Sequence, residues 1–257
     1  MKNPRSVTSA HNPVLQRVRR LARDALAYRR LGQVWVEGEH LCSALLAHGC
    51  TPAMAVVSQE AWSQTGLQSL AAQAAEVVLV SDAVFAEISA LPSPVGIGML
   101  VDWQTSLDPL QAVPTIVLDR VQDAGNVGSL LRSASALGFS QVVALKGTAG
   151  LWSPKVLRAG MGAQFGLRLH EGLEPEALAG LPVPLVATSP HALDRLDTAP
   201  LPWPCAWVFG HEGQGVCEAV RARCAREVRI AQPGGEESLN VAAAAAICLY
   251  ESVRGRQ

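Results

Sequence analysis

Three segments of the chain combine glycines with short polar side chains where a ligand could be bound. They are residues 119–132, 209–216 and 230–240, and each reads as a strand, a glycine-rich turn and a helix. In α/β proteins, ligands collect beyond the carboxyl ends of strands and at helix N-termini. The polar side chains and the helix cation of these segments are Asn126, Glu212, Ser238, Asn240 and Arg132.

The sequence disfavours several familiar kinds of site. Neither GxGxxG nor GxxxxGK followed by Ser or Thr occurs, which argues against a dinucleotide or ATP site. The six cysteines form no CxxC pair and no Cys/His spacing typical of zinc, so we expect no metal. The site type that these observations leave is a crevice of an α/β sheet, lined by short polar side chains and one arginine.

Each candidate residue also has a simpler explanation. Asn126 and Ser238 could have no role beyond capping a helix, because both residue types satisfy free backbone N–H groups at helix N-termini. Glu212 could be an acid in the first turn of a helix, favoured by the helix dipole. Arg132 could be a surface arginine in an ion pair. The order and spacing of the whole set carry more weight than any one member.

Strand and helix patterns alternate along the chain, which predicts an α/β fold. In the first part, strands are expected at residues 33–37, 53–57, 76–80 and 96–101, with helices at 12–30, 40–48, 68–75 and 82–90. Residues 102–114 have no clear periodicity and contain two prolines. We place a domain boundary there, between domains of residues 1–105 and 114–257.

The second domain is expected to contain strands at residues 115–119, 141–145, 185–188, 206–209 and 228–230. Helices are expected at 126–137 and from 216 to about 223. From Ser238 onward the chain is alanine-rich and apolar on every side, so a helix there is expected to be buried all round. Such a helix usually has a partner, and its alanines would let another helix come close.

Charge is distributed unevenly. Residues 1–36 contain eight basic residues and one acidic residue, and the remainder has 13 basic and 21 acidic residues. A basic N-terminal arm on a mildly acidic body suggests a polyanionic partner, although a solvated amphipathic helix would give the same pattern. No apolar run reaches the roughly 18 residues of a membrane span. The N-terminus has no apolar core like that of a signal peptide, so a cytoplasmic location and no membrane partner are expected.

Taken together, the three segments resemble the motifs of one family. Residues 126–134 (NVGSLLRSA), 209–215 (FGHEGQG) and 230–246, with SLNVAAAAA, are similar to the motifs of the SpoU (TrmH-like) RNA ribose 2′-O-methyltransferases. The resemblance covers residues 115–252, over half of the chain. Residues 35–49 (WVEGEHLCSALLAHG) resemble the substrate-binding domain of that family more loosely.

The resemblance implies a fold and a set of partners. The C-terminal domain would be a trefoil-knotted parallel-sheet methyltransferase domain, and the smaller N-terminal domain an α/β/α domain that binds RNA. It also implies a homodimer packed through the knot region and S-adenosylmethionine as cofactor. The substrate would be structured RNA, ribosomal RNA more than transfer RNA. A transfer-RNA 2′-O-methyltransferase and an RNA-binding module without catalysis remain the alternatives.

The resemblance also implies roles for the site residues. Gly210, Ile230 and Leu239 would hold the cofactor, and Arg132, Asn126, Glu212, Ser238 and Asn240 would surround the acceptor ribose. The chain departs from the family pattern at Ala124, where proline is usual, and at His211, where asparagine is common. It also has Ala231 and Gln232 where Pro-Met is common, which is expected to change the wall of the adenosyl pocket modestly.

Overall fold

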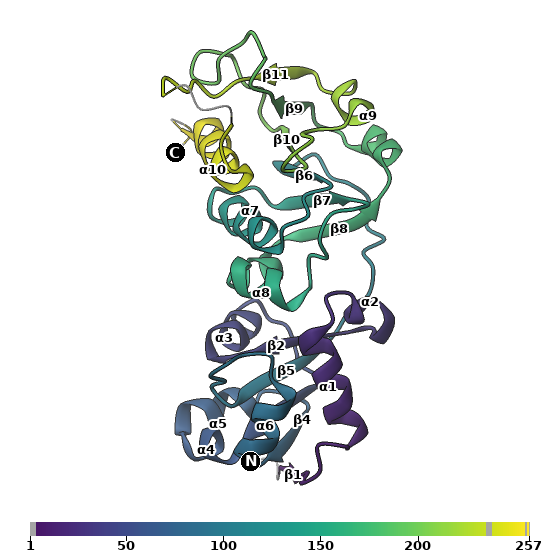
Figure 1. Ribbon diagram of the computed structural model, residues 1–257, viewed down its shortest axis with the longest axis vertical. Coiled ribbons are helices and arrows are strands. Elements are labelled where there is room, and N and C mark those ends of the chain that lie inside the picture. Colours follow the sequence, from purple (N-terminus) through teal and green to yellow (C-terminus); the bar gives the residue numbers. More distant parts are fainter. Residues whose placement is uncertain (1–3, 235–237, 255, 257) are drawn as a thin grey trace. The chain divides into compact units, whose positions relative to one another are not determined.

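The computed structural model describes residues 4–234, 238–254 and 256 and forms two compact units (Figure 1). The first contains residues up to 105 together with 152–165, and the second contains 106–151 and the chain from 166 onward. The division at 105/106 falls inside the proline-containing stretch. Residues 152–165, which the sequence placed in the second domain, group instead with the first unit.

The first unit contains a mixed sheet between two layers of helices (Figure 1). Its strands, in the order β1-β4-β3-β5-β2, are β1 (Arg5–Ser6), β4 (Glu76–Val80), β3 (Met54–Ser58), β5 (Ile97–Asp102) and β2 (Gln33–Glu37). The strand β5 runs antiparallel to β2 and β3, and the other pairs are parallel. Its helices are α1 (Pro13–Arg23), α2 (Ala27–Leu31), α3 (Glu39–Ala47), α4 (Gln59–Ser63), α5 (Thr65–Ala71), α6 (Asp82–Ile88) and α8 (Pro154–Gly160).

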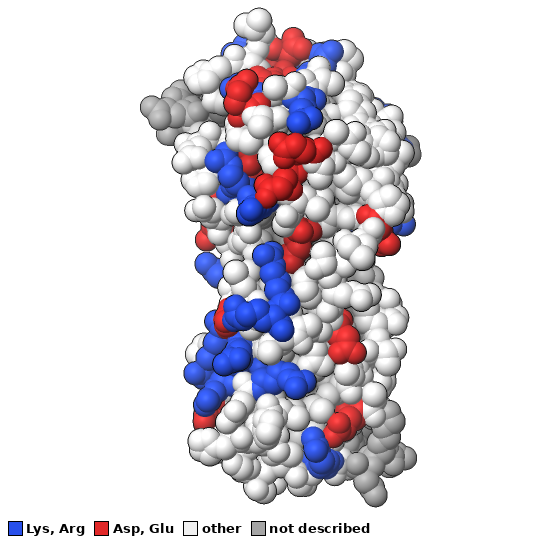
Figure 2. Space-filling model, turned by 90° about the vertical axis from the view of Figure 1, so that its right-hand side faces the viewer, with Lys and Arg blue, Asp and Glu red and all other residues white. Residues whose placement is uncertain are grey.

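The basic N-terminal segment is built into this unit through α1. Leu15, Val18 and Leu21 are buried on the inner side of α1, which leaves its arginines at the surface. Figure 2 shows Lys and Arg side chains crowded together in the lower part of the molecule, which contains α1. Half of the basic residues that the sequence suggested for an arm, namely Arg17, Arg19, Arg20 and Arg23, therefore lie on a packed helix.

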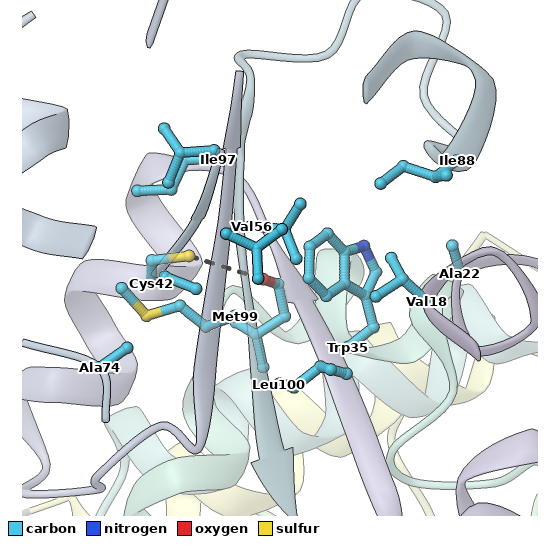
Figure 3. Close-up of a cluster of buried hydrophobic side chains, with 14 of the residues drawn as sticks. Val18, Ala22, Trp35, Cys42, Val56, Ala74, Ile88, Ile97, Met99 and Leu100 are labelled. Carbon is cyan, nitrogen blue, oxygen red and sulfur yellow. Dashed lines mark hydrogen bonds between the residues drawn. The ribbon is translucent and has the colours of Figure 1, made fainter. Parts of the chain in front are cut away.

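The core of the first unit has one layer on each side of the sheet (Figure 3). Trp35 lies against Gly98 on the neighbouring strand, where an added Cβ would come within 2.2 Å of the indole ring. Only glycine leaves room for this contact. On the other side, the Cys42 thiol donates to the Val36 carbonyl over 3.5 Å, and burial raises its pKa to about 12. Cys42 therefore remains a protonated packing residue.

The second unit contains an all-parallel sheet in the order β11-β9-β10-β6-β7-β8. The strands are β6 (Thr115–Asp119), β7 (Gln141–Leu145), β8 (Arg168–Leu173), β9 (Leu185–Thr188), β10 (Ala206–Gly210) and β11 (Arg226–Val228). The helices are α7 (Ala124–Ala136), α9 (Glu218–Arg221) and α10 (Val241–Val253), with a short 3-10 helix at Pro175–Gly180. A second 3-10 helix, Ala163–Gly166, lies at the boundary and belongs almost entirely to the first unit. The strands β6 and β7 are buried throughout, as expected for a parallel sheet covered on both faces.

The strand order reverses direction between β6 and β10. From β6 the chain moves through β7 to the edge strand β8, and then returns to build β9, β10 and β11 on the other side. Ligands of open parallel sheets bind at such a switch point, beyond the carboxyl ends of the strands. Here the two strand ends are neighbours, because Gly210 pairs with Asp119.

The C-terminal helix differs from its prediction. It begins at Val241 instead of Ser238, and only one side is buried, through Ala245, Cys248 and Leu249. On the other side, Ile247 and Tyr250 are 42% and 57% exposed. The prediction of burial all round is therefore wrong for the single chain, since an all-apolar helix needs a second surface to cover it. Among the described residues, no helix is long and apolar enough to cross a membrane.

Candidate active site

The loop after β10 folds back tightly on the end of its own strand. The backbones of His211 and Gly215 exchange hydrogen bonds of 3.1 and 2.8 Å. A Cβ on Gly210 would lie 2.2 Å from the carbonyl carbon of Gly215, so glycine is required at this position. The fold of the loop brings Glu212 to the mouth of the switch point.

Glu212 accepts hydrogen bonds from the loop that leads into α7. Its carboxylate receives the backbone N–H groups of Gln122 at 3.2 Å and Asp123 at 3.1 Å, and the Asn126 amide at 3.1 Å. Burial pushes the pKa of Glu212 upward, but these hydrogen bonds outweigh burial and hold the pKa below its usual value. Glu212 therefore carries a charge at neutral pH. It lies in a turn ahead of α9, so the first-turn explanation is wrong.

Asn126 lies inside α7 and does not cap it. The cap is Asp123, whose carboxylate accepts the Asn126 backbone N–H at 2.8 Å. This leaves the Asn126 amide to bridge two other segments. Its nitrogen donates to Glu212, and its oxygen accepts from Asn240 Nδ2 at 3.0 Å. The capping explanation for Asn126 is therefore wrong.

Asn240 caps α10 and also forms a hydrogen bond to a segment that is distant in the sequence. Its Oδ1 accepts the backbone N–H groups of Ala242 at 2.9 Å and Ala243 at 3.4 Å, which closes the start of α10. Its Nδ2 remains available for Asn126. Glu212, Asn126 and Asn240 thus form a hydrogen-bonded chain, here called the polar triad, that joins all three segments.

A cavity of about 110 Å³ lies between the end of β9 and the start of α10. Its lining residues are Thr188, Ser189, Pro190, Ile230, Gln232, Ser238, Leu239 and Ala244. The cavity includes the predicted residues Ile230, Ser238 and Leu239, whereas Gly210 is not among its lining residues. Sequence reasoning missed Thr188 and Ser189, although polar residues directly after a predicted strand were a usable signal.

Arg132 stands apart from the triad. It is exposed, and none of the residues that the structure describes makes a hydrogen bond or ion pair with its side chain. It follows Asn126 by six positions on α7, which turns the two side chains about 120° apart. Within the single chain, the structure does not bring Arg132 to the other candidates, and its role stays a prediction.

Asp119 and Arg120, both absent from the sequence prediction, support the loop that carries Glu212. Asp119 is only 1% exposed, pairs with Arg120 at 2.9 Å and accepts the Cys217 N–H at 2.6 Å. Burial raises the pKa of Asp119, but the hydrogen bonds from Arg120 and Cys217 outweigh burial and lower it overall. Arg120 adopts φ +60° and donates to Gln214 at 3.0 Å. Strained backbone of this kind persists where surrounding contacts fix it.

Comparison with known proteins identifies the family. A family model described as the SpoU rRNA Methylase family matches residues 114–250. The chain belongs to the SpoU rRNA methylase family. A second model, the MRM3-like substrate binding domain, matches residues 12–98. The resemblance inferred from the three motifs is thereby confirmed.

Two curated relatives extend the SpoU likeness over both units. An uncharacterised tRNA/rRNA methyltransferase of Synechocystis is 33% identical, covering 97% of this chain and 93% of that protein. The 23S rRNA (guanosine-2′-O-)-methyltransferase RlmB of Pseudomonas putida is 31% identical, covering 86% of this chain and 96% of RlmB.

Solved structures agree with these relatives. An RNA 2′-O ribose methyltransferase superposes with a TM-score of 0.80 at 30% identity, covering 98% of this chain and 99% of that one. The SpoU methyltransferase AviRb from Streptomyces viridochromogenes, in complex with AdoMet, gives 0.87 at 25% identity, covering 96% and 98%. The α/β fold with a parallel sheet is therefore the SpoU methyltransferase fold.

The described residues contain no group of three or more His, Cys, Asp or Glu side chains that could hold a metal ion.

Proposed function

We propose that this SpoU family member transfers a methyl group from S-adenosylmethionine to a ribose 2′-hydroxyl of ribosomal RNA. The polar triad carries the proposal, because it joins three motif-bearing segments at the strand ends where α/β proteins bind ligands. The name of the relative RlmB, a 23S rRNA 2′-O-methyltransferase, supports ribosomal RNA as the substrate.

The side chains that line the cavity suit the base of the proposed cofactor. Ile230, Leu239 and Ala244 give it apolar walls against which a base can pack. Ile230 and Leu239 would hold the adenosyl group, with Gly210 keeping the neighbouring loop closed. When bound, S-adenosylmethionine supplies an activated methyl group on a positively charged sulfur.

The acceptor side needs a group that positions the hydroxyl and a group that stabilises the forming negative charge. Glu212 is a poor proton acceptor, since hydrogen bonds to its charged form lower its pKa. We assign Glu212 to orienting Asn126, and Asn126, Asn240 and Ser238 to the ribose side. A guanidinium group keeps its positive charge in proteins, so Arg132 is not assigned the role of a base. Its proposed role is to hold a phosphate or stabilise the alkoxide.

The first unit is proposed to bind the RNA through α1. Arg17, Arg19, Arg20 and Arg23 line a groove of about 650 Å³ beside this helix. Arg19 pairs with Glu87 at 3.2 Å, whereas Arg17 donates to the amide of Gln33 and Arg23 to backbone carbonyls. Neutral partners leave the positive charges of Arg17 and Arg23 uncompensated. Such a row favours phosphates and gives salt-dependent binding without choosing the nucleotide.

Three further features are proposed from the resemblance. The chain is a homodimer, and the exposed Ile247 and Tyr250 on α10 provide an apolar face for the second copy. The C-terminal segment is threaded as a trefoil knot, a proposal supported by the return of α10 from the sheet edge to pack on α7 and β10. The protein acts in the cytoplasm.

The test of the function is to map 2′-O-methylated riboses in RNA from cells with and without the protein. We expect one ribosomal RNA position to lose its methyl group when the protein is absent and to regain it when the gene is restored. Loss confined to a transfer RNA would replace the proposed substrate. An unchanged map, with no methyl transfer by the purified protein, would favour an RNA-binding module without catalysis.

A further inference from the structure

The imidazole of His211 lies against the turn that carries Glu212. Its Nδ1 accepts the backbone N–H groups of Gly213 at 3.0 Å and Gln214 at 3.2 Å. A backbone N–H can only donate, so Nδ1 keeps its lone pair and the ring proton belongs on Nε2. A Cβ on Gly213 would lie 3.8 Å from the Cε1 and Nδ1 atoms of the ring, which places the imidazole beside the backbone of the turn. His211 therefore serves the turn as a hydrogen-bond acceptor.

A second histidine uses the same ring nitrogen in the opposite way. His48 follows α3, and its Nδ1 lies 2.9 Å from the carbonyl oxygen of Ala44, to which it can only donate. That imidazole satisfies a free carbonyl at the end of its own helix. The acceptor role of His211 is therefore specific to its turn, and His48 provides a matched control in the first unit.

The hydrogen bonds of the His211 ring enclose Glu212. They run from the residue before Glu212 to the two residues after it, and the backbone pair between His211 and Gly215 closes the same turn. Asn and Asp side chains fix turns in this way, by accepting N–H groups a few positions further along. The turn sets the direction of the Glu212 carboxylate, which holds the loop before α7 through three hydrogen bonds.

We propose that His211 is a positioning residue, whose Nδ1 fixes the turn so that Glu212 reaches Asn126. The inference rests on the proposed function, since it assumes that the polar triad aligns the acceptor ribose. His211 acts through Glu212 and needs no contact with either substrate. What the turn requires is an acceptor at the place of Nδ1, which asparagine offers through Oδ1 and alanine lacks.

The first experiment compares rates of methyl transfer from S-adenosylmethionine to ribosomal RNA. His211→Ala removes the acceptor and should lower the rate about tenfold, since Glu212 is no longer held against the loop before α7. His211→Asn restores an acceptor and should bring the rate back to within about threefold of the wild type. His48→Ala removes the other imidazole and should leave the rate unchanged. Thermal unfolding of each variant shows that folded proteins are compared.

A double-mutant cycle tests whether His211 acts through Glu212. In a Glu212→Ala background, adding His211→Ala should lower the rate by no more than about twofold, because the carboxylate to be positioned is already gone. Amide hydrogen exchange tests the contact itself in the absence of substrate. The N–H groups of Gly213 and Gln214 should exchange about tenfold faster in His211→Ala than in the wild type or His211→Asn.

The outcomes separate this inference from the function on which it rests. A wild-type rate in His211→Ala, or an equal loss in His211→Ala and His211→Asn, would overturn the inference and leave the proposed function standing. The same loss on top of Glu212→Ala would also overturn it, because His211 would then act independently of Glu212. So would unchanged exchange of the two N–H groups. If the wild-type protein transferred no methyl group to ribosomal RNA, the proposed function would fail and the inference with it.

Discussion

The strand-to-helix turns of the two units use similar residues in different ways. In the first unit, Ser58 ends β3 and Ser81 follows β4, and each side chain accepts the N–H group three positions further along. In the second unit, Asn126 bonds to Glu212, 86 positions away, and Asn240 bonds to Asn126 over 114 positions. Short polar side chains after a strand can thus close a local turn or tie distant segments together.

The difference separates residues that stabilise a helix from residues that build a site. A local cap satisfies a backbone group that would otherwise be free, and its loss costs stability without affecting distant segments. A long-range bond fixes the position of one loop against another, which is what a two-substrate reaction needs. Asn240 does both, so capping and site building are not exclusive.

The largest effect is expected from Arg132, the candidate that lies outside the polar triad. Arg132→Ala should lower the rate of methyl transfer by about 10²- to 10³-fold, since it removes the cation proposed to stabilise the forming alkoxide. Titration should show unchanged S-adenosylmethionine affinity. Arg132→Lys keeps a positive charge, so its rate of methyl transfer should lie between those of the wild type and Arg132→Ala. Near-normal methylation by Arg132→Ala would exclude the proposed role.

A smaller effect is expected at Asn126, and Ser58 provides the matched control in the other unit. Asn126→Ala leaves both Glu212 and Asn240 without a side-chain partner, which should cost roughly 0.5–1.5 kcal/mol of unfolding free energy because both groups are exposed to water. It should also lower turnover about tenfold or more as the loops lose their alignment. Ser58→Ala should cost about 1 kcal/mol with activity unchanged.

Chemical denaturation and methyl-transfer rates of both variants measure the contrast. Equal loss of activity in Asn126→Ala and Ser58→Ala would remove the distinction between capping and site-building residues.

The α1 arginines test whether the first unit contributes charge to RNA binding. Arg17, Arg20 and Arg23 replaced together by Gln should reduce the slope of log affinity against log salt by about 2, at roughly 0.7 for each single-strand phosphate contact. Substitution is preferable to deletion of residues 1–36, because that segment contains buried core residues. The control replaces Arg195 and Arg254, which are paired with Asp197 and Glu251 in the second unit. An unchanged slope in the α1 variant would place the RNA elsewhere.

The smallest effect concerns the pH dependence of the triad. The pKa of Glu212 in the folded protein lies below its ordinary value of 4.5. The ionised carboxylate therefore stabilises the folded state at pH values above 4.5. This contribution is lost as the pH falls through the folded pKa. The difference in Tm between wild type and Glu212→Gln should therefore shrink as the pH is lowered from roughly 6 to roughly 3. A constant difference would show that the charge of Glu212 does not stabilise the loop.

Most of the regular structure could be predicted from the sequence, because apolar periodicity records which faces are buried. The strands at 33–37, 76–80, 115–119, 141–145 and 185–188 agree with the structure. The strand β8 was missed because it lies at the sheet edge, where only His170 is buried and no apolar pattern forms. The helix α9 is only four residues long, too short for its period to define its ends.

The candidate site was predicted in part, and its missing elements share a physical reason. Polar residue types at turns marked Asn126, Glu212 and Asn240, but spacing alone could not show that Asp123 takes the cap and leaves Asn126 free to bridge. The buried Asp119 ended an apolar strand and looked like part of it. Thr188 and Ser189 reach the cavity only through the parallel packing of β9 and β11, which no local pattern encodes. The family resemblance had already placed Gln232 at the wall of the pocket, and it lines the cavity.

The central claim is that three separate turns form one site that methylates a ribose oxygen. The most direct measurement incubates the purified protein with ribosomal RNA and S-adenosylmethionine carrying a deuterated methyl group, then identifies the labelled nucleoside by mass spectrometry. The account predicts the label on a single 2′-O-methyl ribose and a sharp loss of label in Asn126→Ala. Label on a base, or equal labelling by Asn126→Ala, would contradict it.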